Sequence, residues 1–176
     1  MANSNKRYLV DWKEDSFPYL DKNLYEVKSD ETPLANCLAV PPYNCFAFAA
    51  GDDTRWWEPD LAGQYYWPSG IARDYTVAAC IEMFESLGYE KCWQSTPEPE
   101  FEKVAVYHTR LGNPWTPSGS LTHAALQQNG IWKSKLGYWE DIEHLSLESL
   151  NGEDVTGSTE PYGEPIQILK RKLNRI

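Results

Sequence analysis

The chain has 176 residues, a formal net charge of −10 at pH 7, 41% hydrophobic residues and 24% charged residues. This length and composition predict one soluble globular domain over residues 1–176. The acidic balance argues against nucleic-acid binding, and no apolar run approaches the roughly 20 residues that span a bilayer. Because the start lacks an apolar leader, the cytoplasm is the expected location, and neither nucleic acid nor membrane is an expected partner.

The first 35 residues contain two aromatic-rich pieces, Y-L-V-D-W and L-Y-E-V-K, interrupted by prolines. This pattern predicts short edge strands or a wrapping arm rather than a long helix. A small apolar run follows, in which C-F-A-F-A-A stands between Asn44 and Gly51. Because Asn44 suits an N-cap and Gly51 suits a helix end, a helix of two turns is predicted to begin at Cys45.

The next segment, R-W-W-E-P-D-L-A-G-Q-Y-Y-W-P-S-G, is predicted to be an irregular loop because of its prolines and glycines. Its five large aromatics make it too apolar for a plain solvent-exposed loop. In D-Y-T-V-A-A-C-I-E-M-F-E-S-L-G-Y, apolar residues recur at steps of three and four. This period predicts a second helix that ends at Gly88 and buries Cys80.

After this helix the apolar period changes to two, which indicates strands. F-E-K-V-A-V-Y-H predicts one strand, and Asn129-Gly130 predicts the turn of a β-hairpin between L-T-H-A-A-L-Q-Q and I-W-K-S-K-L. In that register His123 lies opposite Leu136, with Ser134 diagonal to His123 on the same face. With a last strand, P-I-Q-I-L-K-R, the fold class is α+β, with N-terminal helices packed on an antiparallel β-sheet.

Cys45 is the leading candidate for chemistry. A thiol attacks as thiolate, and both a helix N-terminus and a nearby imidazolium favour the anion. The backbone N–H groups at the helix start would also stabilise a developing oxyanion. An activated Cys45 is therefore predicted to react with iodoacetamide at pH 6 before the other cysteines. The alternative is that Cys45 is a packed core residue, because free cysteine is often buried.

Few residues of this chain can act as a base, because it has three histidines. His123 is the candidate base, and its alternative is a histidine satisfied by a neighbouring carbonyl. His144 lies in E-D-I-E-H, where acidic neighbours are expected to raise its pKa. A metal site built from His123, His144, Asp141 and Glu140 is a further alternative. None of these has a tight ligand spacing such as H-E-x-x-H, so neither a metal nor a cofactor is predicted.

The order of these elements resembles the papain-like superfamily in the circularly permuted form of the NlpC-type and CHAP-type amidases. In those families the strand before the histidine reads G-D and three hydrophobic residues, and the histidine begins H-V. Here K-V-A-V-Y and H-A-A-L fill those positions. The resemblance covers roughly residues 40–137 and implies a papain-like core there, with residues 138–176 as a C-terminal loop and final strand.

Carried over to this sequence, the resemblance implies Cys45 as nucleophile, His123 as general base and Asn44 as the polar residue before the nucleophile. The D-C-S-G signature of the NlpC type is absent. The third catalytic residue is assigned to Asp141, since a carboxylate stabilises imidazolium better than a hydroxyl does. Ser134, indicated by the hairpin register, and Glu140, from the same acidic run as Asp141, are the alternative orienting residues.

A second resemblance extends over more of the chain. N-C-F-A-F-A-A-G-D, E-S-L-G-Y-E, E-K-V-A-V-Y, T-H-A-A-L-Q and S-K-L-G-Y-W-E-D-I-E-H together are similar to a family of bacterial proteins of unassigned function. This resemblance implies no reaction. It indicates that the five blocks belong to one unit.

The leading hypothesis is a papain-like cysteine hydrolase or acyltransferase that cleaves an amide-type bond in a peptide or small amide. Asn44, Arg55, Trp56 and Trp57 are the expected substrate-binding residues, with Arg55 available for a carboxylate. The alternative is a catalytically inactive binding module on the same scaffold. Eight tryptophans and eleven tyrosines suit an aromatic surface for a protein partner.

Overall fold

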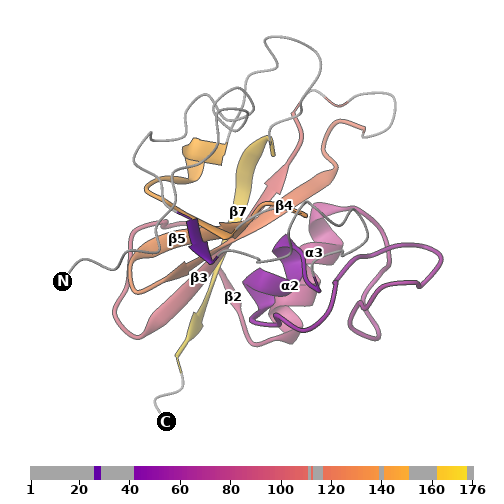
Figure 1. Ribbon diagram of the computed structural model, residues 1–176, viewed down its shortest axis with the longest axis horizontal. Helices are drawn as coiled ribbons and strands as arrows, with labels where there is room; N and C mark the ends of the chain where they lie inside the picture. The colour runs from indigo at the N-terminus through magenta and orange to yellow at the C-terminus, as the bar shows by residue number, and fades with distance from the viewer. Residues whose placement is uncertain are drawn as a thin grey trace.

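Two short helices lie on one face of an antiparallel sheet in the computed structural model (Figure 1), which describes residues 26–28, 42–110, 112, 117–138, 141–150 and 162–173. The helices are α2 (Cys45–Ala50) and α3 (Val77–Ser86). This arrangement confirms the α+β class. No helix in these ranges is long and apolar enough to cross a membrane.

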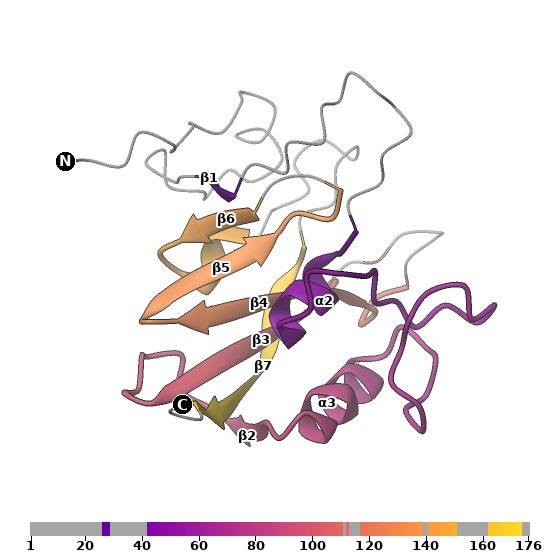
Figure 2. The same ribbon diagram turned by 60° about the horizontal axis from the view of Figure 1, so that its bottom comes forward.

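The sheet has seven strands in the order β1-β6-β5-β4-β3-β7-β2, and every neighbouring pair is antiparallel. The long strands β3, β4 and β7 lie at its centre (Figure 2). The strand bounds are Glu26–Lys28 (β1), Glu90–Cys92 (β2), Phe101–His108 (β3), Leu121–Gln128 (β4), Ile131–Lys135 (β5), Asp141–His144 (β6) and Glu164–Lys172 (β7).

The start and end of α2 follow from local sequence signals. The Asn44 side chain accepts a hydrogen bond from the backbone N–H of Ala47 at 3.2 Å, which caps the helix. Gly51 ends the helix with φ of 84°, a left-handed conformation that glycine adopts without steric cost. The predicted helix at Cys45 is therefore confirmed.

The β4–β5 hairpin also confirms its prediction. Asn129 and Gly130 have φ of 52° and 82°, and two positive values are what a type I′ turn requires. Gln128 pairs with Ile131, and the register continues to Leu126 and Lys133.

The region after residue 137 holds more regular structure than the predicted loop and final strand. It contains β6 and a 3-10 helix at Leu147–Leu150. β6 reads D-I-E-H, and its Asp141 and His144 are buried. Because these buried positions are polar, a hydrophobic pattern cannot detect the strand. Of the predicted N-terminal arm, the described part is β1, which pairs with β6 at the sheet edge.

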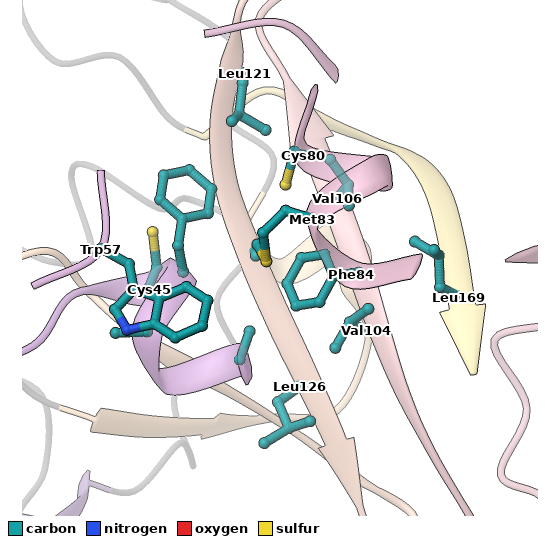
Figure 3. Packing of buried hydrophobic residues seen from close by; sticks show 14 of the residues in the cluster. Cys45, Trp57, Cys80, Met83, Phe84, Val104, Val106, Leu121, Leu126 and Leu169 are labelled. Carbon is teal, nitrogen blue, oxygen red and sulfur yellow. The ribbon is translucent and has the colours of Figure 1, made fainter. Parts of the chain in front are cut away.

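The two faces of the sheet bury two separate clusters. The first, which we call the helix face, joins α2 and α3 to residues of β3, β4 and β7 (Figure 3). The second, which we call the second face, lies on the other side and receives the 3-10 helix. Side chains that alternate along β4 belong to different faces, because Ala124 and Leu126 pack on the helix face and Ala125 on the second face.

Candidate functional site

Cys45 is the first residue of α2 and is 6% exposed within the helix-face cluster. Asn44 holds this turn in place. Its side-chain amide donates to the carbonyl of Trp57 at 2.6 Å, while its oxygen caps the helix. Because the amide nitrogen and the oxygen of the Asn44 side chain both bind the protein backbone, Asn44 holds the helix start at Cys45 in place.

The pKa of the Cys45 thiol is raised to about 12. Burial is the main cause, and the negative charge of Glu58 acts in the same direction. The backbone N–H groups of Ala124, Phe46 and Cys45 itself favour the thiolate and lower the pKa in part. The predicted activation by the helix start is thus present, but burial outweighs it, and Cys45 is a neutral thiol at pH 7.

His123 lies in β4 on the second face and is fully buried. Its ring stacks on Tyr162 with centroids 4.0 Å apart and meets the ring of Tyr107 edge-on at 5.4 Å. These two tyrosines hold the plane of the imidazole. Burial, with a smaller contribution from the charge of His144, lowers the pKa of His123 well below its usual value.

Ser134 and His144 continue from His123 across two neighbouring strands. Ser134 Oγ lies 3.0 Å from His123 Nε2 and 3.0 Å from His144 Nε2. His144 Nδ1 lies 2.8 Å from the carbonyl oxygen of Ser146. Burial lowers the pKa of His144 to about 4. The expectation that acidic neighbours would raise this pKa is wrong, because the ring points into the core and not toward the neighbouring acids.

Cys45 and His123 share no hydrogen bond, and their side chains lie on opposite faces of the sheet. Within the described ranges, Nε2 of His123 binds Ser134, and Nδ1 has no hydrogen-bond partner. Two electrostatic effects link the surroundings of Cys45 to those of His123. The N–H that faces the Cys45 sulfur belongs to Ala124, the residue after His123. The charge of Cys45 also contributes to a raised pKa of Tyr162, the ring that stacks on His123.

Asp141 does not orient His123. Its Oδ2 accepts a hydrogen bond from the hydroxyl of Tyr43 at 2.8 Å, and its Oδ1 lies 3.9 Å from Nζ of the buried Lys135. The pairing of β6 with β5 explains why Asp141 is not beside His123, because this register places Asp141 opposite Lys135. The alternative Glu140 lies outside the described residues. Of the two described candidates, Ser134 is the one that contacts the imidazole.

The predicted substrate-binding residues of the aromatic loop are held by contacts with residues both inside and outside that loop. Arg55 pairs with Asp52 at 2.7 Å and lies over the ring of Tyr66. Trp57 is buried and donates to Asp52 at 2.9 Å. Trp56 remains half-buried and packs on Tyr138 with centroids 4.8 Å apart. The irregular loop is confirmed, and Arg55 already has a carboxylate partner.

A metal centre does not form in the described part of the chain. No group of three or more His, Cys, Asp or Glu side chains gathers there as ligands. His123 and His144 both contact Ser134, whereas Asp141 contacts Tyr43 and lies near Lys135.

Two residues of the site were missed by sequence reasoning. In the sequence Tyr162 follows a segment rich in Ser, Gly and Glu, and Tyr107 has the pattern of an ordinary strand residue. Tyr107 donates to the carbonyl of Leu147 at 2.9 Å, and Tyr162 accepts at its own carbonyl from Thr122. The register of β3 against β4, which places Tyr107 opposite His123, is the signal that could have found Tyr107.

The fold and site define an α+β protein with a buried thiol at a helix start on one face of the sheet and a histidine–serine–histidine chain on the other. The chain belongs to the family described as Domain of unknown function (DUF7689), whose model matches residues 27–170. No curated protein and no solved structure matches the chain. Membership in this family therefore does not indicate a reaction.

Proposed function

We propose that this protein is a cysteine hydrolase or acyltransferase, papain-like in its arrangement, that acts on an amide-type bond of a peptide or small amide. Cys45 is the nucleophile and His123 the general base. One observation carries the proposal. His123 Nδ1 is a buried imidazole nitrogen that has no hydrogen-bond partner among the described residues. The next residue, Ala124, turns its backbone N–H toward the Cys45 sulfur. Buried polar atoms are normally satisfied, so an exception calls for an explanation, and a catalytic role is one such explanation.

The proposed reaction begins with a neutral pair, because burial raises the pKa of Cys45 and lowers that of His123. Because the Cys45 and His123 side chains lie on opposite faces of the sheet, substrate binding must first bring them together. The Cys45 proton then passes to His123 Nδ1 as the sulfur attacks the carbonyl carbon of the substrate. The carbonyl electrons move to oxygen, and backbone N–H groups at the start of α2 stabilise that oxyanion. When the tetrahedral intermediate collapses, the C–N bond breaks, and the amine leaves with the proton from His123.

The product of this half-reaction is a thioester at Cys45. Water or an acceptor amine then attacks the thioester carbonyl as His123 takes the proton of the attacking group. When the C–S bond breaks, His123 returns that proton to the sulfur, which leaves as the thiol. The small exposure of Cys45 requires that substrate displace the side chains around it. We therefore expect Cys45 to react faster with a substrate-like reagent that binds the site than with a small alkylating reagent.

The test compares two reagents on the same protein. With limiting iodoacetamide at pH 7, we expect the half-exposed Cys92 to be modified before the buried Cys45 and Cys80. With a mixture of peptidyl vinyl sulfones that differ in the residue before the reactive group, we expect modification at Cys45, located by peptide mapping. The order expected from the sequence, with Cys45 first toward iodoacetamide, is thereby reversed for the small reagent.

His123→Gln should slow the vinyl sulfone reaction at Cys45 at least tenfold, because it removes the base. The matched control is His108→Gln, since His108 is half-buried and binds Glu164 at 3.2 Å, away from the proposed site. Equal labelling of Cys45 in the two variants, or labelling of Cys92 by both reagents, would contradict the proposal.

A binding module is the second candidate, favoured by an aromatic cluster on the surface. Trp56 packs between Tyr65 and Tyr138, with centroids 6.0 Å and 4.8 Å away, and the two tyrosines are 39% and 58% exposed. Half-exposed aromatics of this kind suit a protein partner. The high pKa of the Cys45 thiol also fits a site without chemistry. Absence of Cys45 modification by every vinyl sulfone would favour this second function.

A further inference from the structure

A chain of hydrogen bonds crosses three neighbouring strands on the second face. It runs from His123 of β4 through Ser134 of β5 and His144 of β6 to the carbonyl of Ser146, with distances of 3.0, 3.0 and 2.8 Å. The three side chains are 0%, 0% and 1% exposed. In such a dry setting each donor needs an acceptor, so the direction of each bond can be derived.

The direction is set at the end of the chain by the Ser146 carbonyl. A carbonyl oxygen only accepts, so His144 Nδ1 carries a hydrogen and donates to it. Burial keeps His144 neutral at pH 7, which leaves its Nε2 as an acceptor. The Ser134 hydroxyl therefore donates its hydrogen to His144 Nε2.

The same reasoning continues to His123. With its hydrogen committed to His144, Ser134 Oγ accepts from His123 Nε2, which must carry the ring hydrogen. His123 is neutral because burial lowers its pKa, so its Nδ1 holds a lone pair and no hydrogen. Stacking on Tyr162 and the edge contact with Tyr107 resist a flip of the ring.

We infer that His144, acting through Ser134, is a positioning residue that fixes the tautomer of His123 and leaves Nδ1 as the basic nitrogen. Its meaning for catalysis rests on the function proposed above, but the tautomer itself does not. In a purely structural network the last atom would also find a partner. Here the chain ends at His123 Nδ1, which has no hydrogen-bond partner among the described residues; the residue after His123 is Ala124, whose backbone N–H faces the Cys45 sulfur.

The test measures the tautomer by NMR in the full chain labelled with ¹⁵N-histidine. With three histidines in the sequence, the long-range ¹H–¹⁵N spectrum can be assigned by single variants, and His108 is the internal reference. We expect His123 to show a protonated Nε2 and an unprotonated Nδ1 at pH 7. A protonated Nδ1, or an average of the two forms in the wild type, would overturn the inference.

Variants of His144 separate positioning from packing. His144→Leu removes the acceptor, and the His123 nitrogen shifts should move toward the average of two tautomers. His144→Gln is the matched variant, because its amide oxygen can accept from the Ser134 hydroxyl, and it should restore the wild-type shifts. Ser134→Ala, a smaller change, should produce the same averaging as His144→Leu and keeps the test decisive if the leucine variant does not fold.

Unchanged His123 shifts in a folded Ser134→Ala variant would contradict the inference. This result is separable from the proposed function. If His123 shows the expected tautomer but vinyl sulfones do not label Cys45, the positioning role is supported and the proposed enzymatic function is contradicted. If vinyl sulfones label Cys45 but His123 shows the opposite tautomer, the positioning role is contradicted and the proposed enzymatic function is supported.

Discussion

The helix face and the second face of the sheet are stabilised in different ways. On the helix face, α3 packs Cys80, Met83 and Phe84 over Val104 and the rest of the central strands (Figure 3). On the second face, buried tyrosine, histidine and serine side chains bind one another or backbone carbonyls. The first face depends mainly on filled volume, whereas the second adds buried hydrogen bonds to its own apolar cluster. Cys45 lies on the helix face, and His123 lies on the second face behind the same strand.

Removal of volume from the helix face should have the largest effect on stability. Phe84 is fully buried and meets Tyr89 edge-on, so Phe84→Ala should lower the free energy of unfolding by about 3–5 kcal/mol. Urea denaturation followed by circular dichroism measures this loss. Phe84→Leu, which keeps most of the volume, should lose about 1.5 kcal/mol or less. Similar losses for both variants would show that packed volume does not govern this face.

Removal of a hydroxyl from the second face should have the next largest effect. Ser134→Ala leaves the two buried imidazoles without their shared partner and should cost about 1–3 kcal/mol by urea denaturation. Tyr107→Phe is the matched control, because it removes one hydroxyl bond, to the Leu147 carbonyl, and should cost about 1 kcal/mol. A loss from Ser134→Ala smaller than that of the control would show that the shared Ser134 hydroxyl does not stabilise the two imidazoles.

A smaller, pH-dependent effect should also come from the second face. Burial lowers the pKa of His144 to about 4 and that of His123 well below its usual value. Between pH 6.5 and 5.5 the unfolded chain therefore binds protons that the folded protein does not, so stability falls as pH falls. We expect a loss of about 1 kcal/mol per histidine over this range.

The matched variant for this pH effect is His144→Gln, which should lose about half of the slope, since it removes one of the two groups. Denaturation midpoints at both pH values decide the matter. A slope unchanged by His144→Gln would mean that His144 is not held neutral.

Local signals made much of the fold predictable. Asn44 before an apolar run gave the position of α2, and Asn129-Gly130 gave the hairpin, because a cap and a type I′ turn depend on adjacent residues. The hairpin register also predicted that Ser134 lies on the face of His123. β6 was missed because two of its three buried residues, Asp141 and His144, are polar, and their partners Tyr43 and Ser134 are remote in sequence.

The candidate site was predictable as residue types and less so as geometry. Asp141 was preferred on chemical grounds, yet its contacts are with Tyr43 and Lys135 because β6 fixes where its side chain points. The pKa of Cys45 depends on burial by residues of several elements, which no short motif encodes. Tyr162 could not be predicted, since its stacking on His123 requires the tertiary structure.

The most direct measurement is the intact mass of the protein after brief mixing with an N-acetylated amino acid phenyl thioester and an acid quench. We expect one acyl group, mapped to Cys45, in the wild type and in Cys80→Ala, and none at the mutated site in Cys45→Ala. His123→Gln should form the adduct at least tenfold more slowly. Acylation at Cys92 alone, or equal rates at Cys45 with and without His123, would contradict catalysis by this pair.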